Sequence, residues 1–387
     1  MNQRTIELLF AFVRSAISGT KIKDEERESY SSDMLEDLLE IAFKHDMVHM
    51  LVYGLKQNNL ISKEDAQIEK SIFTAVYRYE RLKYEYENLC NALENAQIPF
   101  IPLKGSVIRK YYPESWMRTS CDIDVLVHED DLNKAISYLS KNLQYVEKGR
   151  TTHDVLLISP IGIHIELHFD LVEEDCANNA IDILSSVWNN VSLHENYGYW
   201  YEMSDEFFYF YHIAHMAKHF ETGGCGVRPF IDLWILDNMN GANKLKRDEL
   251  LLKGGLSDFA NTSRTLNEVW FGEKKADELI SKLQDFILHG GLFGSVDNRV
   301  ALQQKKKGGR LRYFVSRVFI SYAKLKRYYP ILEKHRWLMP VMQIRRCFMI
   351  FKPDVARMAK REVIVNSSID KTKADEMNIF MKNIGLK

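Results

Sequence analysis

The chain has 387 residues, 46% of them hydrophobic, and its 52 Lys and Arg nearly balance its 53 Asp and Glu. This length allows about two or three domains of ordinary size, and the apolar content is enough to bury a core, so we expect a globular protein. No apolar run reaches the roughly 20 residues that a membrane span needs, and the stretch 6–16 is interrupted by Glu7 and Arg14 without a cleavage site behind it, which argues against a signal peptide.

The cysteines are odd in number, far apart and in no paired spacing. They are Cys90, Cys121, Cys176, Cys225 and Cys347. Such usage is typical of reduced thiols and not of a disulfide framework or a zinc site, so we expect a cytoplasmic protein.

The first part of the chain, residues 1–96, has apolar residues at spacings of three and four, which predicts a helical N-terminal region. The pattern changes at 98–103, a short apolar run with two prolines that fits a strand entering a turn. We expect the turn at Lys104, Gly105 and Ser106, with Ser106 capping a helix over 107–112 that Pro113 ends.

Strand and helix patterns then alternate. Residues 121–128 alternate and are rich in Ile and Val, 132–143 are amphipathic and helical, and 152–159 and 162–169 read as two further strands. The predicted fold class is therefore α+β, with a small mixed-sheet domain at 97–203 between two helical regions.

The helical period returns at 204–362, with interruptions at three Gly-Gly pairs. The segment 363–387 is polar, and we expect this tail to be partly disordered.

Three acidic residues stand out in the predicted strands. Asp122 and Asp124 are separated by one residue, so both side chains point to the same face, where their repulsion is relieved by a divalent cation. Glu166 lies between two apolar residues on a later strand, where an acid is costly to bury without a partner. Together the three predict a two-metal site, although each acid could equally face solvent on an edge strand.

The turn at Lys104, Gly105 and Ser106 precedes these acids and strengthens the hypothesis. A glycine that follows a strand and opens a helix lets backbone amides meet phosphate oxygens. Lys104 would add a positive charge to the same phosphates.

The segments Leu103-Lys104-Gly105-Ser106, Arg118-Thr119-Ser120-Cys121-Asp122-Ile123-Asp124 and Ile165-Glu166-Leu167-His168 resemble those of the DNA polymerase β-like nucleotidyltransferases. The sequence is most similar to a largely uncharacterised bacterial nucleotidyltransferase family, from about residue 98 to 236. In one departure, Cys121 stands where many relatives have a small polar residue or Gly, and we expect it to alter packing only.

The resemblance implies that Asp122, Asp124 and Glu166 are the catalytic metal ligands, for Mg²⁺ or Mn²⁺, and that Gly105 and Ser106 form the phosphate turn. It also implies transfer of a nucleoside monophosphate from an NTP to an acceptor hydroxyl, with release of pyrophosphate. The acceptor stays open among a small molecule, a sugar, a protein and an RNA. Two alternatives are a regulatory module that binds nucleotide without transfer and an RNA-modifying toxin of the same superfamily.

Further residues are candidates for nucleotide contacts. Arg118 and Ser120 precede the metal strand, so they could reach the triphosphate, and Lys218 is a candidate for a phosphate contact. Arg228 and Asp232 are one helical turn apart and could pair with each other. His164 and His168 would share the strand face of Glu166.

Three histidines, His212, His215 and His219, fall on one face of a predicted helix. No Glu-His zinc motif accompanies them, so we expect a partly buried helix face with hydrogen-bonded histidines and not a zinc site. A role in lining the nucleotide or acceptor cleft stays open.

The C-terminal part is strongly basic. From Arg299 to Arg361, 18 Lys and Arg stand against Glu333 and Asp354, a net charge of +16, with aromatic residues interleaved. This composition fits RNA binding or an anionic membrane surface, and it also fits ordinary solvated helix faces.

Overall fold

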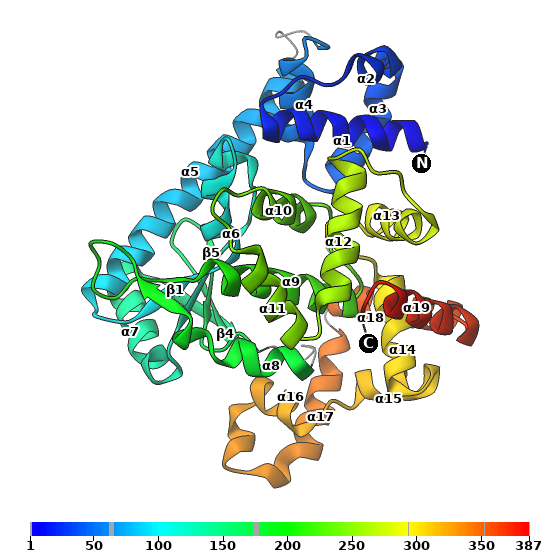
Figure 1. Cartoon of the computed structure of the whole chain (residues 1–387). Coiled ribbons are helices and arrows are strands. Elements are labelled where there is room, and N and C mark those ends of the chain that lie inside the picture. The colour runs from blue at the N-terminus through cyan, green and yellow to red at the C-terminus, as the bar shows by residue number, and fades with distance from the viewer. Residues whose placement is uncertain (1, 62–65, 173–177, 293, 352, 387) are drawn as a thin grey trace.

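The structure is a computed structural model of the chain, and it describes residues 2–61, 66–172, 178–292, 294–351 and 353–386. A central sheet lies beside a long helix, α5 (Ala66–Asn95), and helical regions extend from both (Figure 1). Cys176 lies outside the described residues. None of the described helices is both long enough and apolar enough to cross a bilayer.

The sheet is mixed and has the strand order β1-β2-β5-β4-β3. Its strands are β1 (Phe100–Pro102), β2 (Asp122–Val127), β3 (Val146–Arg150), β4 (Asp154–Ile158) and β5 (His164–His168). β2 and β5 run parallel, and the other neighbours are antiparallel. A separate hairpin consists of β6 (Val191–Leu193) and β7 (Tyr201–Met203).

One face of the sheet is covered by α5 and α7. The shared core contains Leu89 of α5, Leu139 of α7 and the inward residues Ile123 and Val125 of β2, all fully or nearly fully buried. Apolar residues at alternate positions of β2 thus bury one face, while the opposite positions are left for polar side chains.

Helices before and within this domain cover the rest of the N-terminal half. They are α1 (Gln3–Ser18), α2 (Asp24–Ser29), α3 (Leu35–Lys44), α4 (Val48–Gln57), α5 (Ala66–Asn95), α6 (Lys104–Ile108), α7 (Leu132–Leu143) and α8 (Asn178–Ser185). α1 is capped at its start by Asn2, whose side chain accepts a hydrogen bond from the backbone of Arg4, and at its end by Gly19, which has φ 72°.

The C-terminal half is helical. Its helices are α9 (Asp205–Glu221), α10 (Arg228–Asp237), α11 (Lys244–Lys253), α12 (Ser257–Trp270), α13 (Glu278–Gly290), α14 (Val296–Lys307), α15 (Arg310–Val318), α16 (Tyr322–Tyr328), α17 (Met339–Cys347), α18 (Pro353–Ser368) and α19 (Lys371–Asn383).

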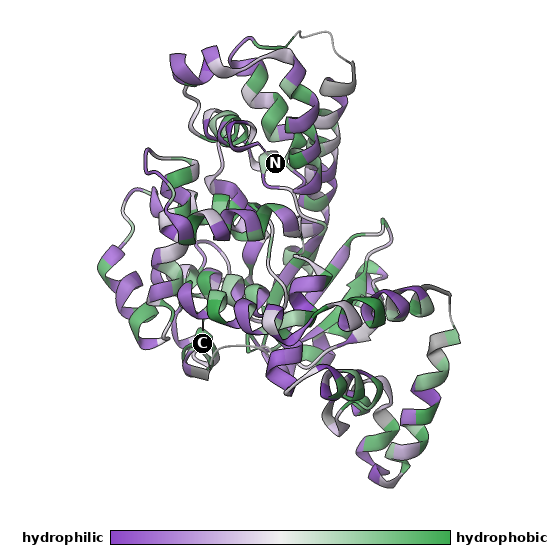
Figure 2. Ribbon diagram, turned by 90° about the vertical axis from the view of Figure 1, so that its right-hand side faces the viewer, coloured by the Kyte–Doolittle hydropathy of each residue, from purple (hydrophilic) through white to green (hydrophobic). Residues whose placement is uncertain are grey.

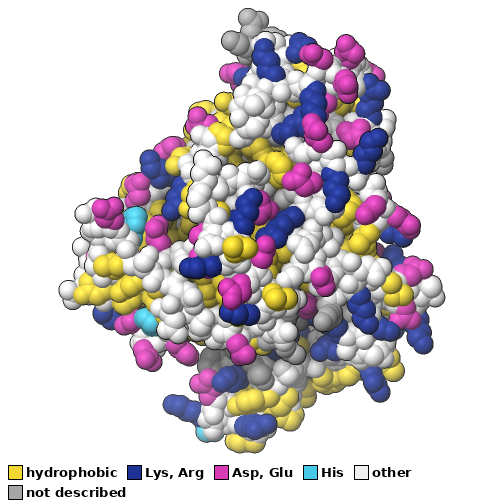
Figure 3. Space-filling model, viewed as in Figure 1, with side chains coloured by type: hydrophobic (Ala, Val, Ile, Leu, Met, Phe, Trp, Pro, Cys, Tyr) yellow, Lys and Arg dark blue, Asp and Glu magenta, His cyan; other side chains and the backbone are white. Residues whose placement is uncertain are grey.

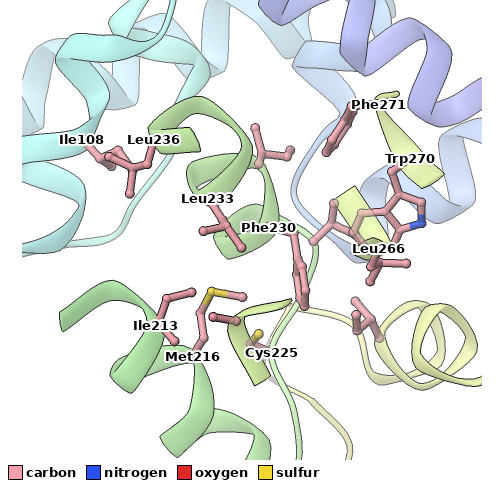
Figure 4. Packing of buried hydrophobic residues seen from close by; sticks show 14 of the residues in the cluster. Ile108, Ile213, Met216, Cys225, Phe230, Leu233, Leu236, Leu266, Trp270 and Phe271 are labelled. Atoms are coloured by element: carbon pink, nitrogen blue, oxygen red, sulfur yellow. The ribbon is translucent and has the colours of Figure 1, made fainter. Parts of the chain in front are cut away.

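The largest hydrophobic core joins these helices to the front of the sheet and to α1. Figure 4 shows Phe230 of α10 between Met216 of α9 and Trp270 of α12. The Trp270 ring stacks on Phe10 of α1 with centroids 4.1 Å apart and meets Phe230 edge-on at 5.4 Å. The N-terminal helix is therefore packed into the same core as α10 and α12.

The predicted α+β class and the flanking helical regions are confirmed. The expected strands at 98–103, 121–128, 152–159 and 162–169 correspond to β1, β2, β4 and β5, and the expected helix at 132–143 is α7. The sequence did not predict β3, because all five of its residues are exposed and no apolar alternation marks them.

Two local expectations are wrong. The short helix α6 begins at Lys104, with Leu103 at the N-cap, so Ser106 lies inside the helix and does not cap it. The tail is not disordered where it is described, since α18 and α19 occupy most of it. Met381, Ile384 and Leu386 are buried in the main core, which supplies the apolar contacts that hold this end of the chain.

Because of a buried histidine, we expect the free energy of unfolding to decrease at acidic pH. His45 follows α3, its Nε2 lies 3.3 Å from the carbonyl of Leu288, and burial lowers its pKa from 6.5 to about 4. Because the unfolded chain binds the proton more readily, this site stabilises the fold above pH 6.5, and that contribution is lost as the pH falls towards 4. The loss amounts to about 3 kcal/mol at 1.36 kcal/mol per pKa unit.

We therefore expect the free energy of unfolding, measured with urea between pH 7 and pH 4, to fall less steeply in His45→Gln than in the wild type. His289→Gln, at an exposed histidine, is the control and should keep the wild-type slope. Equal slopes for wild type and His45→Gln would contradict the assignment.

Candidate metal and nucleotide site

Two neighbouring strands carry the predicted acids. The parallel register of β2 and β5 pairs Asp122 with His164 and Asp124 with Glu166. Since Ile123 points into the core behind the sheet, the acids on either side of it project from the front. The sheet therefore brings together carboxylates that are far apart in the sequence.

Asp124 is almost fully buried and has two close partners. Nζ of Lys104 lies 2.8 Å from its Oδ1, and Nε2 of His168 lies 2.9 Å from the same oxygen. Oε2 of Glu166 is 4.0 Å from Lys104 Nζ and 3.6 Å from His168 Nε2. Lys104 reaches this position from a backbone with φ 45°, at the start of α6.

The pKa values of Asp124 and Glu166 are shifted in opposite directions. Burial by itself raises the pKa of Asp124, but Lys104 and the hydrogen bond with His168 outweigh it and hold that pKa well below its ordinary range. At Glu166 the hydrogen bond with His168 acts to lower the pKa, yet burial and the charge of Asp124 prevail and the pKa is raised. Asp124 is thus a permanent anion, whereas Glu166 holds a proton more readily than an ordinary glutamate.

The donor set fits a divalent cation. Asp124, Glu166 and His168 offer ligand atoms that all lie within 4.8 Å of one another. Carboxylate oxygens suit Mg²⁺ and Mn²⁺ better than imidazole does. His168 bonds Asp124 and so orients it, whereas Asp122, half-buried on the same strand face, is not a member of this group among the described residues.

A second group of metal-capable residues lies beside the first and shares His168. It contains His153 and Asp154, whose Nε2 and Oδ2 atoms are 3.0 Å apart. The sequence analysis did not single out these residues. His153 and Asp154 face the site because β4 pairs Asp154 with His168 of β5. The spacing of residues in the sequence does not predict this strand pairing.

Gly105, in the predicted phosphate turn, stands where there is little room for a side chain. A Cβ atom at Gly105 would lie 3.1 Å from a guanidinium nitrogen of Arg118 and 3.6 Å from one of Arg109. The backbone nitrogen of Ser106 donates to the carbonyl of Leu103, and Oγ of Ser106 is buried with no hydrogen-bond partner in the described part of the chain. Gly105 therefore allows two arginines to pack against the turn.

Arg118 is held by an ion pair and does not point freely towards a ligand. Its Nη2 lies 2.8 Å from Oδ2 of Asp232, and its Nε is 3.0 and 3.1 Å from the two carboxylate oxygens. Tyr112 donates to the same carboxylate at 2.6 Å. The expected pair of Arg228 with Asp232 is therefore wrong: Asp232 pairs with Arg118, and Arg228 donates to the carbonyl of Thr119 at 2.6 Å.

Ser120 is linked to the turn through a residue that the sequence analysis missed. Nη2 of Arg109 donates to Oγ of Ser120 at 2.8 Å, while its Nε donates to the carbonyl of Gly105 at 2.8 Å. Arg109 follows Gly105 by four residues, and this helical spacing was the available signal. The arginine connects the phosphate turn with the strand that carries Asp122 and Asp124.

The histidines of α9 face each other and the lysine of the site. Nε2 of His219 and Nε2 of His215 are 3.2 Å apart, and His212 bonds the carbonyl of Pro229 at 2.9 Å. Burial, and then the charges of neighbours that include Lys104 and Lys218, hold the pKa of His215 well below its ordinary value. Within the described ranges these histidines are not among the groups of side chains that could hold a metal ion. Lys218 lies on this helix, and its charge acts on His215.

The sequence model of a family described as uncharacterised nucleotidyltransferases matches residues 31–272. The match covers more than half of the chain, including the whole sheet and the acids. The chain belongs to this family. Searches among curated proteins and among solved structures found no match.

Membership in the uncharacterised nucleotidyltransferase family confirms the resemblance seen in the sequence and indicates a transferase. The matched range begins before α3 and ends just after α12. It leaves out the basic C-terminal part, which is a feature of this chain outside the family match.

Proposed function

We propose that the protein transfers a nucleoside monophosphate from an NTP to an acceptor hydroxyl and releases pyrophosphate. The observation that carries this proposal is the pairing of Asp124 with Glu166 on adjacent strands beneath Lys104, in a member of a nucleotidyltransferase family. Asp122, Asp124 and Glu166 would hold Mg²⁺ or Mn²⁺. Such an ion neutralises phosphate oxygens and lowers the pKa of an attacking hydroxyl.

The side chains of the site have distinct roles in this proposal. His168 fixes the orientation of Asp124. The ammonium of Lys104 lies between the carboxylates of Asp124 and Glu166, and it can pair with the phosphates of a bound nucleotide. Glu166 is about one third exposed, so it is the carboxylate of the site that an acceptor hydroxyl can reach and that can take up its proton. The acceptor oxygen bonds the α-phosphorus as its proton passes to Glu166, and the bond to the leaving pyrophosphate breaks.

A cavity of about 800 Å³ shares Ser106 with the turn that begins α6, although Asp122, Asp124 and Glu166 are not among its lining residues. Ser106 and Arg109 line it from α6 and the turn after it, Tyr86 from α5, and Trp200 and Glu202 from the hairpin. Two polar atoms of lining residues, Oγ of Ser106 and Nε1 of Trp200, are buried and have no hydrogen-bond partner among the described residues. Buried polar atoms normally have partners, so these two are suited to a bound molecule.

The cavity favours a small molecule as the acceptor over a polymer, because its volume is that of a site for a compact ligand. Lys110 is paired with Glu202 at 3.2 Å and Asp205 with Arg247, so the lining offers little unbalanced charge for a polyanion. An uncharged ring compound with hydroxyl groups matches the aromatic lining and the two unpaired polar atoms.

The proposal is tested by incubating the protein with each radiolabelled NTP, Mg²⁺ and a total cell extract. We expect one class of molecule to become labelled by the wild type and not by Asp122→Asn. Equal labelling by both proteins would overturn the proposal. Label on RNA would favour the toxin alternative, and nucleotide binding without any transfer would favour the regulatory module.

The acceptor cavity makes a separate prediction. Trp200→Phe keeps a ring against Phe100 but removes the unpaired N–H. With the acceptor that the labelling identifies, we expect its KM to rise about fivefold, which corresponds to one hydrogen bond of about 1 kcal/mol, with little change in kcat or in the KM for NTP.

Trp188→Phe is the matched control, because Trp188 is also half-buried and ring-stacked, on His128, but does not line the cavity. An acceptor KM that stays at the wild-type value in Trp200→Phe would place the acceptor elsewhere and leave the transfer reaction itself standing.

A further inference from the structure

The segment 310–351, here called the C-terminal lobe, projects from the helical half at the end of the molecule away from α1 to α4 (Figure 1). It contains α15, α16 and α17, the short turns of helix at Pro330–Glu333, Arg336–Leu338 and Phe348–Phe351, and a small core of its own made by Ile320, Leu325 and Leu332. So small a core leaves most apolar side chains of the lobe outside it.

The lobe exposes apolar residues far more densely than the rest of the described chain. Of 25 exposed large hydrophobic residues, 11 lie between positions 311 and 351. These are Leu311, Phe314, Val315, Phe319, Tyr328, Ile331, Trp337, Val341, Ile344, Phe348 and Phe351. Large exposed apolar residues that gather in one segment of a fold indicate a binding surface.

The apolar residues follow helix faces. Val341, Ile344, Phe348 and Phe351 are spaced by three and four residues across α17 and the turn after it, and they are 52%, 60%, 63% and 78% exposed. In a helix at the surface of a globular protein, an apolar stripe of this kind normally packs against the core. Here it points outward, so the amphipathic helix has its apolar side directed at an external partner.

The same surface is strongly basic. The lobe has ten Lys and Arg against one acidic residue, Glu333, a net charge of +9. Figure 3 shows dark blue and yellow side chains side by side on the lower end of the molecule, and Figure 2 shows hydrophobic and hydrophilic residues mixed along the helices that project there. A partner must therefore accept apolar side chains and carry negative charge.

We propose that the C-terminal lobe docks on an anionic lipid surface. Lipid acyl chains accept aliphatic and aromatic side chains alike, anionic headgroups pair with Lys and Arg, and a tryptophan as exposed as Trp337, at 74%, suits the boundary between them. Single-stranded RNA would use the basic and aromatic residues but gains little from Leu311, Val341 or Ile344. This docking places the transferase at a membrane without a spanning helix.

The test is co-sedimentation of the full chain with vesicles of phosphatidylcholine alone and of phosphatidylcholine with about one third phosphatidylglycerol. We expect binding to the anionic vesicles at least tenfold stronger, weakened by salt. Ile344→Ser with Phe351→Ser should weaken this binding at least tenfold. The matched control, Leu245→Ser with Leu252→Ser, changes two exposed leucines on α11, outside the lobe, and should bind as the wild type does.

Because all four substituted side chains are exposed, both double variants should fold, which their thermal unfolding checks. Failure of the wild type to prefer anionic vesicles, or equal binding by the two double variants, would overturn the proposal. So would binding of a single-stranded RNA more tightly than the vesicles with no loss in the lobe variant. None of these outcomes bears on nucleotidyl transfer, which is measured separately.

Discussion

Asp122→Asn is expected to lower the rate of nucleotidyl transfer about 10³-fold and to leave the fold unchanged. A bound metal ion contributes several kcal/mol of charge stabilisation in the transition state, and each 1.36 kcal/mol is a factor of ten in rate. Asp122 is half-buried and does not belong to the tight cluster of Asp124, Glu166 and His168, so neutralising it breaks no buried pair in the described part of the chain.

The measurement is the rate of pyrophosphate release with Mg²⁺, together with thermal unfolding. Asp130→Asn, at an exposed aspartate three residues after β2, is the control and should keep full activity. Near wild-type turnover in Asp122→Asn would show that this aspartate is not a metal ligand.

Asp124→Asn is a less clean experiment, although the sequence alone suggests that the two aspartates are equivalent. Asp124 is the shared acceptor for Lys104 and His168, and both of those side chains are largely buried. Loss of its charge leaves the ammonium of Lys104 without its closest counter-ion, so this variant should lose stability as well as activity. Asp122 and Asp124 differ in how their side chains are packed, and the spacing of residues in the sequence does not predict this difference.

Four of the five strands of the sheet, and the acids on them, were predictable because alternation is a local property. Ile123 and Val125 mark the buried face of β2, and the acids between them must then share the opposite face. The position of Glu166 beside Asp124 required the strand register, which the resemblance to nucleotidyltransferases supplied.

Contacts made between distant elements were not predictable. Arg118 and Asp232 come from the loop before β2 and from α10, and sequence proximity instead suggested a pair between Arg228 and Asp232. His153 and Asp154 reach the site only through the antiparallel pairing of β4 with β5. In each case the tertiary structure determines which charged residues form a pair, and no periodic pattern in the sequence indicates it.

The ion pair of Arg118 with Asp232 should matter more to stability than the other ion pairs described above. The two side chains are only 10% and 2% exposed, and Arg118, together with the hydroxyl of Tyr112, holds the pKa of Asp232 below its ordinary value against the effect of burial. Removing one partner of a buried pair leaves an uncompensated charge, which typically costs about 3–5 kcal/mol. We therefore expect Asp232→Asn to lower the free energy of unfolding by that amount.

Urea unfolding at neutral pH measures this effect, and two further variants separate it from a general loss of charge. Glu278→Gln removes one partner of an exposed pair with Lys282 and should not shift the unfolding midpoint measurably. Arg118→Met combined with Asp232→Leu removes both buried charges, so the double variant should be more stable than Asp232→Asn, because no charge is left unpaired in the core. If Asp232→Asn unfolds at the wild-type urea concentration, or if the double variant is the less stable of the two, then Arg118 is neutralised by other groups.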